Sequence, residues 1–153
     1  MTRSEIISRL KKNFKIQELV CPHTLKRHSD KSWMFLDTEA LHTLLVLRCD
    51  ILQVPLICND YSINLTQRGL RCNLCELIKD KTDREELYLT AHSNGKGWDL
   101  TSPKMTAEEM RKKIEEKQDL LPYPVKIELK VNWLHIDCYD DIDNDNKITY
   151  FNP

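Results

Sequence analysis

Glycine is scarce in this chain, at only three of 153 residues. Two of the three, Gly95 and Gly97, stand two positions apart. Where a chain uses so little glycine, we expect each one at a point of positive φ or of close backbone approach. A long apolar run is also missing, because no stretch nears the roughly 20 residues needed to cross a bilayer. The sequence therefore predicts no membrane insertion.

An excess of either charge is absent too, with 23 basic against 24 acidic residues and a formal net charge of −1. This balance excludes the basic surface typical of proteins that bind nucleic acid or anionic membranes. The basic run at 111–113 is flanked by acidic residues and predicts a solvated helix face. The first 16 residues carry charges among their apolar positions and no cleavage pattern, so we expect no secretory signal. We expect synthesis in the cytoplasm and any exit by release or by signal-independent export.

A second CxxC motif and a paired histidine motif are missing as well. The six cysteines are Cys21, Cys49, Cys58, Cys72, Cys75 and Cys138. They are dispersed, and several fall within apolar runs, which predicts free, half-buried thiols rather than disulfides. Cys72 and Cys75 have the spacing of a zinc knuckle, but a closed structural site takes four ligands. With no second pair in the sequence to complete it, this spacing alone is weak support for a metal site.

What is present is the composition of an ordinary globular protein, 41% hydrophobic and 31% charged, and we expect one domain over residues 1–153. Apolar spacing and capping residues predict helices at 4–12, 37–52, 70–79 and 106–117. Polar, punctuated residues predict a loop at 22–32. Apolar or alternating runs predict strands at 55–60, 86–92, 97–101, 125–131 and 133–139. Helices first and strands later favour an α+β fold, with a mostly antiparallel sheet flanked by helices.

The two closely spaced glycines fall between a histidine, His92, and an aspartate, Asp99. We expect a strand, a tight loop over Gly95 and Gly97, and a second strand. Such a hairpin would place His92 at the end of one strand beside Asp99 on the next. One imidazole and one carboxylate would then converge on a point, as a zinc site requires.

A third ligand is expected from the strand that contains His135. Alternate side chains of a strand share a face, so Trp133 and Asp137 should point the same way as His135. We expect both to support the ligands, with Asp137 orienting an imidazole. Three protein ligands leave one position for water, the mark of a catalytic zinc. Taken singly, each histidine is more often a hydrogen-bonded core residue.

Together these residues form two motifs: Thr90, His92, Gly95, Gly97 and Asp99, then Trp133, His135 and Asp137. The motifs closely resemble those of the zinc peptidases that include D-Ala-D-Ala carboxypeptidases and phage L-alanyl-D-glutamate endopeptidases. The family has Ser and Ala where this chain has Thr90 and Gly97. The segment 14–21 (FKIQELVC) also resembles the family's N-terminal segment, so the likeness covers roughly residues 14–140. It implies a hedgehog-like (DD-peptidase-like) fold, a Zn²⁺ cofactor and hydrolysis of peptidoglycan stem peptides, in a phage or a bacterium.

The general base is less clear, because many relatives place an acid three positions before the last histidine ligand and this chain has Asn132 there. Asparagine does not accept a proton at neutral pH. The nearest acid upstream is Glu128, seven residues before His135. On an unbroken strand an odd separation puts the two on opposite faces, so a bulge or a turn near 131–132 would be needed. Glu128 is our candidate base.

The resemblance also implies an arginine that holds the substrate carboxylate through two parallel hydrogen bonds. The segment 59–62 occupies the family's position for it and contains none. Arg68 and Arg71 are the displaced candidates, and the sequence does not choose between them or exclude that both are surface residues.

The acidic tail has part of a calcium-loop pattern at Asp141, Asp143 and Asp145. Position twelve is Asn152 rather than glutamate, which favours a solvated acidic terminus.

Two hypotheses therefore stand. The first is a zinc peptidase that acts on the cell wall after release, and the second is a non-catalytic zinc domain that binds wall peptides or has a structural role. The sequence leaves open carboxypeptidase against endopeptidase action, and the oligomeric state.

Overall fold

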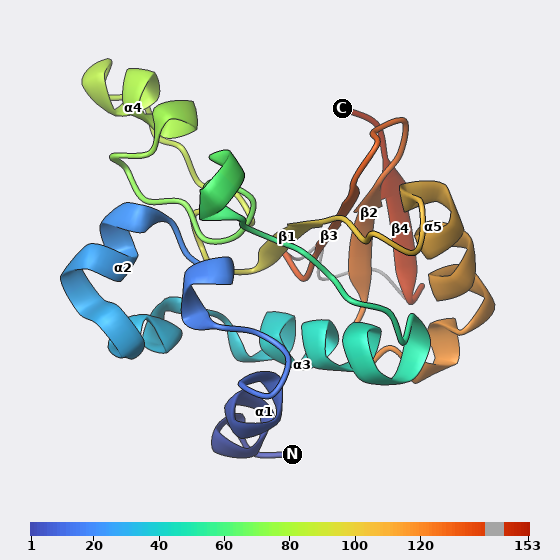
Figure 1. Cartoon of the computed structure of the whole chain (residues 1–153). Helices are drawn as coiled ribbons and strands as arrows, with labels where there is room; N and C mark the ends of the chain where they lie inside the picture. The colour runs from blue at the N-terminus through green and yellow to red at the C-terminus, as the bar shows by residue number, and fades with distance from the viewer. Residues whose placement is uncertain (140–145) are drawn as a thin grey trace.

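A four-stranded sheet with helices along one side is the main feature of the computed structural model, which describes residues 1–139 and 146–153 (Figure 1). The α-helices of this part of the chain are α1 (Arg3–Leu10), α2 (Pro22–His28), α3 (Thr38–Val46), α4 (Glu76–Asp83) and α5 (Ala107–Glu116). Short 3₁₀ helices are Ile16–Glu18, Ser29–Phe35, Tyr61–Ile63 and Gln118–Leu120, and Leu47–Ile51 extends α3 as a π-helical turn. The strands are β1 (Gly97–Leu100), β2 (Val125–Glu128), β3 (Leu134–Asp137) and β4 (Ile148–Phe151). The expected α+β class is confirmed.

The sheet has the order β1-β3-β2-β4 and is mixed. β3 pairs antiparallel with β1 and β2, but β4 pairs parallel with β2. The expectation of a mostly antiparallel sheet is therefore wrong at this edge. The polar residues from 140 onward predicted a tail without a strand, so β4 was not expected. β3 ends beside the start of β2, and β4 begins at that same end of the sheet, so β4 runs in the same direction as β2.

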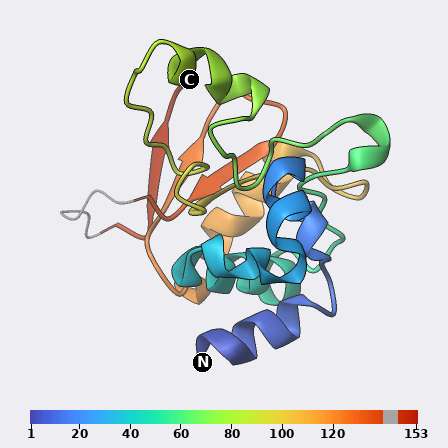
Figure 2. The ribbon, with the colours of Figure 1, turned by 90° about the vertical axis from the view of Figure 1, so that its left-hand side faces the viewer.

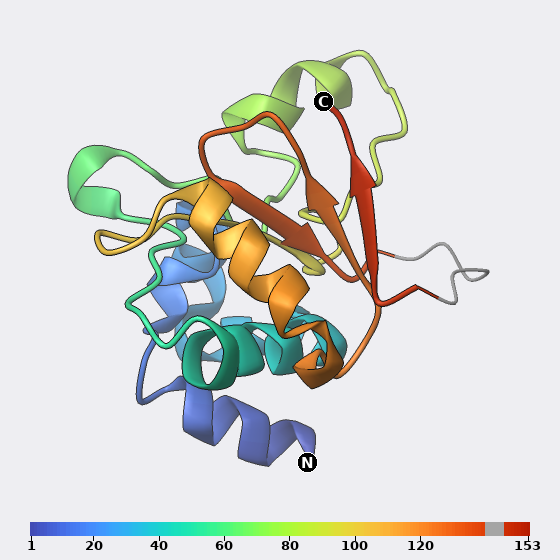
Figure 3. The ribbon, with the colours of Figure 1, turned by 90° about the vertical axis from the view of Figure 1, so that its right-hand side faces the viewer.

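Helices α3 and α5 cover one face of the sheet, and Figure 3 shows α5 lying across it. Trp98 of β1 is buried on this side and donates a hydrogen bond from Nε1 to the Ala40 carbonyl of α3, at 3.1 Å. Ile127 of β2 and Ile136 of β3 are fully buried in the same core. Since side chains alternate along a strand, the intervening residues of β1, β2 and β3 point to the opposite face, which the two helices leave uncovered.

The expected helix starts are confirmed at two caps. The Asp37 side chain accepts hydrogen bonds from the backbone of Glu39 and Ala40 and begins α3. Thr106 and Glu109 form a reciprocal capping box at the start of α5. Both caps satisfy amide groups that have no partner within the helix.

The expected loop at 22–32 is wrong, since α2 and most of the following 3₁₀ helix occupy it. Pro22 stands in the first turn of α2, where its fixed φ suits a helix start and its missing N–H costs nothing. Ser32 and Trp33 are buried beneath it. Because α2 is largely exposed, its sequence is polar and shows no apolar stripe that would predict a helix.

Two expected strands are also absent from the described structure. The segment 55–60 forms no strand and takes part only in two isolated bridges, Ile57 with Thr101 and Asp60 with Leu65. Residues 86–90 have no regular secondary structure, and 91–95 form a turn. Leu87 is 86% exposed and Leu89 is 59% exposed, so the alternation of this segment does not reflect burial.

The sequence predicted a solvated helix face at the basic run 111–113. That prediction is wrong for Arg111, which is only 5% exposed. Its guanidinium group donates to the backbone carbonyls of Glu128, Val131 and Trp133. Arg111 thereby fastens α5 to the connection between β2 and β3.

Among the described residues, no helix combines the length and the apolar character that crossing a bilayer requires.

Candidate metal centre

His92, Asp99 and His135 come together on the uncovered side of the sheet. One ligand atom from each lies within 4.8 Å of the others, and the three residues are 5%, 7% and 9% exposed. Asp99 and His135 are directly paired across β1 and β3, which puts both side chains on one face. The group lines an open pocket of about 640 Å³ and is able to hold a metal ion.

A turn, rather than the expected hairpin strand, presents His92. The turn is closed by backbone hydrogen bonds within residues 90–96. Gly95 has φ of +66°, and a Cβ there would lie 2.3 Å from the Phe35 carbonyl oxygen. Gly97 has ordinary φ, but a Cβ would lie 2.8 Å from the Ala91 Cβ. As expected, Gly95 stands at a positive φ and both glycines stand at close approaches. The element that presents His92 is a turn, not the expected strand of a hairpin.

The third glycine, which the sequence analysis did not use, orients His92. The Nδ1 atom of His92 lies 2.9 Å from the Gly69 carbonyl oxygen. That carbonyl accepts a hydrogen bond from Nδ1–H, which leaves Nε2 facing Asp99 at 3.3 Å. The Arg71 amide donates to the His92 carbonyl at 3.2 Å and holds the two segments side by side. A Cβ at Gly69 would lie 2.2 Å from the Leu19 carbonyl oxygen, so the approach requires glycine.

His135 lies between two carboxylates. Its Nδ1 is 2.7 Å from Asp99 Oδ1, and its Nε2 is 3.0 Å from Asp137 Oδ2. Burial opposes the charge on the ring, but the hydrogen bonds to Asp137 and Asp99 outweigh it and raise the pKa of His135 to about 9. Each histidine thus has one nitrogen held by an oxygen acceptor and the other directed at Asp99. A ligating histidine needs this arrangement to fix its ring and tautomer.

Asp99 receives three cationic or donor groups. Burial alone would raise the pKa of Asp99, but hydrogen bonds from His135 and His92 hold it well below its usual range. Arg71 Nη2 lies 2.9 Å from Asp99 Oδ2, and both side chains are largely buried. The carboxylate is therefore ionised, as a metal ligand must be.

The structure separates the two arginine candidates. Arg71 lines the pocket and reaches Asp99. Arg68 does not line it, and its guanidinium group lies 3.4 Å from the Thr101 hydroxyl. Of the two, only Arg71 is placed where a substrate group could meet it.

Glu128 lies on the pocket wall together with His135. The chain turns between β2 and β3, with Lys130 at φ of +61°, so the two residues stand on neighbouring antiparallel strands. The register pairs Lys126 with Asp137 and Ile127 with Ile136, and one further step brings Glu128 opposite His135. The turn required by the sequence analysis is present. Opposite residues share a face, so the odd separation does not exclude Glu128.

The three remaining residues singled out in the sequence lie in two different pockets. Trp133 and Asp137 line the pocket with His135. Asn132 is exposed and lines a different pocket beside α5.

The sequence did not predict the wall of the site that β4 forms. Phe151 of β4 packs edge-on against the His135 ring, with centroids 5.7 Å apart. No local signal in the polar tail pointed to it. The calcium-loop pattern at Asp141, Asp143 and Asp145 lies outside the described residues.

No family model, curated protein or solved structure matches this chain.

Proposed function

We propose that this protein is a zinc-dependent peptidase whose metal ligands are His92, Asp99 and His135. The observation that carries the proposal is the arrangement of the two imidazoles. The Gly69 carbonyl holds one, Asp137 holds the other, and each presents its second nitrogen to Asp99 at the floor of an open pocket.

The donor set fits zinc, which favours imidazole and carboxylate ligands and takes three protein ligands at catalytic sites. Nε2 of His92, Nδ1 of His135 and the Asp99 carboxylate would hold the ion. When bound there, zinc supplies Lewis acidity and an activated water near neutral pH.

Glu128 serves as the general base, because it is the glutamate on the pocket wall in the strand next to His135. It takes the proton of the attacking water and passes it to the leaving amine. Arg71 holds a carboxylate of the substrate, since its guanidinium group already reaches into the pocket and pairs with a carboxylate there.

The substrate class rests on the two sequence motifs, which resemble those of peptidases that cleave peptidoglycan stem peptides. A pocket of about 640 Å³ has room for a short peptide segment. The hedgehog-like fold belongs to the same proposal.

The test compares Glu128→Gln with Glu116→Gln, a change at an exposed glutamate of α5, in release of peptides from purified peptidoglycan. We expect zinc-loaded wild type and Glu116→Gln to cleave equally. Glu128→Gln should keep its zinc and lose about 10²- to 10⁴-fold in rate, the usual contribution of a general base. Full activity in Glu128→Gln would remove this residue from the mechanism.

A non-catalytic wall-binding domain is the alternative, and the position of Asn132 favours it. The residue that replaces the family's usual acid is exposed and does not line the metal pocket. Zinc-loaded wild type that binds peptidoglycan and releases no peptide would support this alternative.

A further inference from the structure

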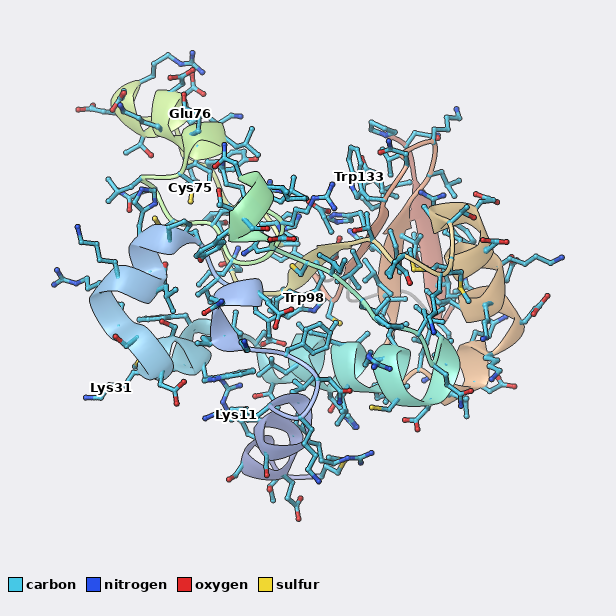
Figure 4. The ribbon with its side chains drawn as sticks, in the orientation of Figure 1. Lys11, Lys31, Cys75, Glu76, Trp98 and Trp133 are labelled. Carbon is cyan, nitrogen blue, oxygen red and sulfur yellow. The ribbon has the colours of Figure 1, made fainter. Side chains whose placement is uncertain are left out.

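A second group of metal-ligating side chains lies where α2 meets the base of α4. It consists of Cys21, His23, Cys72 and Cys75, whose ligand atoms all lie within 4.8 Å of one another. Figure 4 labels Cys75 in this region, between the two helices. The sequence analysis found no partner for the Cys72 and Cys75 pair. The sequence contains no second CxxC, but the structure supplies the other two ligands from Cys21 and His23, and His23 stands 49 residues before Cys72.

The three distances among Cys72, Cys75 and His23 match a zinc tetrahedron, and the Cys21 Sγ lies within 4.8 Å of the other three ligand atoms. With Zn–S of about 2.3 Å and Zn–N of about 2.0–2.1 Å, tetrahedral edges are about 3.8 Å between sulfurs and about 3.6 Å between sulfur and nitrogen. The Sγ atoms of Cys72 and Cys75 are 3.9 Å apart. Nδ1 of His23 lies 3.6 Å from the first and 3.9 Å from the second.

The backbone brings the two halves of the group together. Val20 and Leu70 form a parallel bridge, and the Cys21 amide donates to the Leu70 carbonyl at 3.0 Å. Cys21 and Cys75 are the residues that precede α2 and α4, so two helix starts face each other. The Cys75 amide donates to the Cys72 carbonyl at 3.0 Å, which closes a tight turn between these two ligands.

We propose that Cys21, His23, Cys72 and Cys75 bind one structural zinc ion. Three thiolates and one imidazole suit a borderline-soft metal, and four protein ligands close the coordination shell. The Cys21 and Cys75 side chains are buried, and His23 lies at the exposed edge. This site shares no residue with the His92 centre and does not depend on hydrolysis.

A disulfide is the competing use of these cysteines. The Cys72 and Cys75 sulfurs are 3.9 Å apart, against about 2.05 Å in a disulfide, and all six cysteines are free thiols.

The zinc ion has a clear structural task. Helix α4 lies at the periphery, as Figures 1 and 2 show. Its Leu77 is exposed and Ile78 is its one buried residue, so the helix has little core of its own. Binding at Cys72 and Cys75 ties the start of α4 to α2. It also fixes Arg71, which precedes Cys72 and pairs with Asp99. The second metal thus positions the arginine of the first site.

The experiment measures zinc per chain by elemental analysis in the reduced, purified full-length protein. We expect two equivalents in wild type, one in Cys72→Ser/Cys75→Ser and one in His92→Ala. Cys49→Ser, which removes a thiol outside both groups, is the matched control and should keep two. Because the two variants remove different ions, failure of one site is distinguishable from failure of the other.

Cobalt loading of wild type gives a readout that does not depend on a variant folding. Bound to three thiolates, cobalt should show intense near-ultraviolet charge-transfer absorption, which His92→Ala should retain. Absence of that absorption in cobalt-loaded wild type would overturn the proposal. So would a Cys72→Ser/Cys75→Ser variant that folds and keeps both zinc ions.

Discussion

At the scale of single residues, His135 is held at both of its ring nitrogens. It lies between Asp99 and Asp137, one carboxylate at each ring nitrogen. Without a metal this arrangement favours a proton on both nitrogens, and with a metal one of those protons must leave. Protons and metal ions therefore compete for the same atom.

A pH dependence follows from that competition. The pKa of His135 is raised from 6.5 to about 9 in the folded chain. In the metal-free protein its stabilising effect is full below pH 6.5 and is lost as pH rises through 9. Zinc affinity should show the opposite trend, rising about tenfold per pH unit over this range, because one proton is displaced.

Histidine proton resonances, followed by NMR in the presence of a chelator, measure this directly. One ring should titrate near pH 9. His42 is an internal reference, because burial and the nearby N-terminal amine lower its pKa below 6.5. If every ring titrates at or below 6.5, the proposed contact between His135 and its carboxylates is wrong.

Asp137 should control zinc affinity without touching the ion. Its carboxylate holds Nε2 of His135 and also accepts from the Tyr139 amide at 2.8 Å. We expect Asp137→Ala to weaken zinc binding about 10- to 100-fold, measured by competition with a chromogenic chelator. Asp119→Ala, at an exposed position before β2, should bind like wild type. Equal affinity in both variants would contradict the role given to Asp137.

At the scale of elements, two connections set the geometry of the site: the turn that holds His92 and the turn between β2 and β3. The first turn depends on Gly95, because the surrounding backbone leaves no room for a larger residue there. The second depends on Arg111, which donates hydrogen bonds to three backbone carbonyls.

Gly95→Ala tests the first turn. The substitution places a Cβ against the Phe35 carbonyl and forces a non-glycine residue to a φ of +66°. We expect a loss of at least about 1–3 kcal/mol in the free energy of unfolding, measured by denaturant titration. Lys96→Ala, at the next position, should change it by less than about 0.5 kcal/mol. A neutral Gly95→Ala would mean that the turn is built differently.

Arg111→Met tests the second. It keeps much of the buried side-chain volume and removes the donors to the carbonyls of Glu128, Val131 and Trp133. Leaving three part-buried acceptors without these partners should cost at least about 2 kcal/mol. Lys112→Met, on the exposed side of α5, is the matched control and should be near neutral. Similar unfolding midpoints for the two variants would count against this bracing role.

The sequence predicted those elements that are marked by a strong local signal, such as a helix cap or a glycine turn. The Asp37 cap, the Thr106 capping box and the glycine spacing all have physical causes within a few residues. What failed was non-local. Strand β4 depends on pairing with β2, and the fourfold cysteine and histidine group depends on a bridge between Val20 and Leu70. Neither pairing leaves a pattern in the local sequence.

At the scale of the whole molecule, the sheet divides two tasks between its faces. Helices α3 and α5 cover one face and bury Trp98, Ile127 and Ile136. The other face carries Asp99 and His135. The expectation of a single domain stays a prediction. One hydrophobic core nevertheless includes residues from the helices and from the sheet.

The sequence predicted that His92, Asp99 and His135 lie together, and the structure brings their ligand atoms within 4.8 Å of one another. The prediction was possible because the alternation of a strand and a glycine turn are local rules. The sequence did not choose between Arg68 and Arg71 or place Glu128. Those positions depend on how the segment at 67–71 and the turn after β2 pack against β1 and β3, and that packing is long-range.

The central claim is that His92, Asp99 and His135 bind a zinc ion. Crystals of the zinc-loaded full-length chain, measured on both sides of the zinc absorption edge, test it most directly. We predict an anomalous peak bounded by Nε2 of His92, Nδ1 of His135 and the Asp99 carboxylate, at about 2.0–2.2 Å from each. The account would be contradicted by zinc-loaded crystals with no peak at this position and with Arg71 still paired to Asp99.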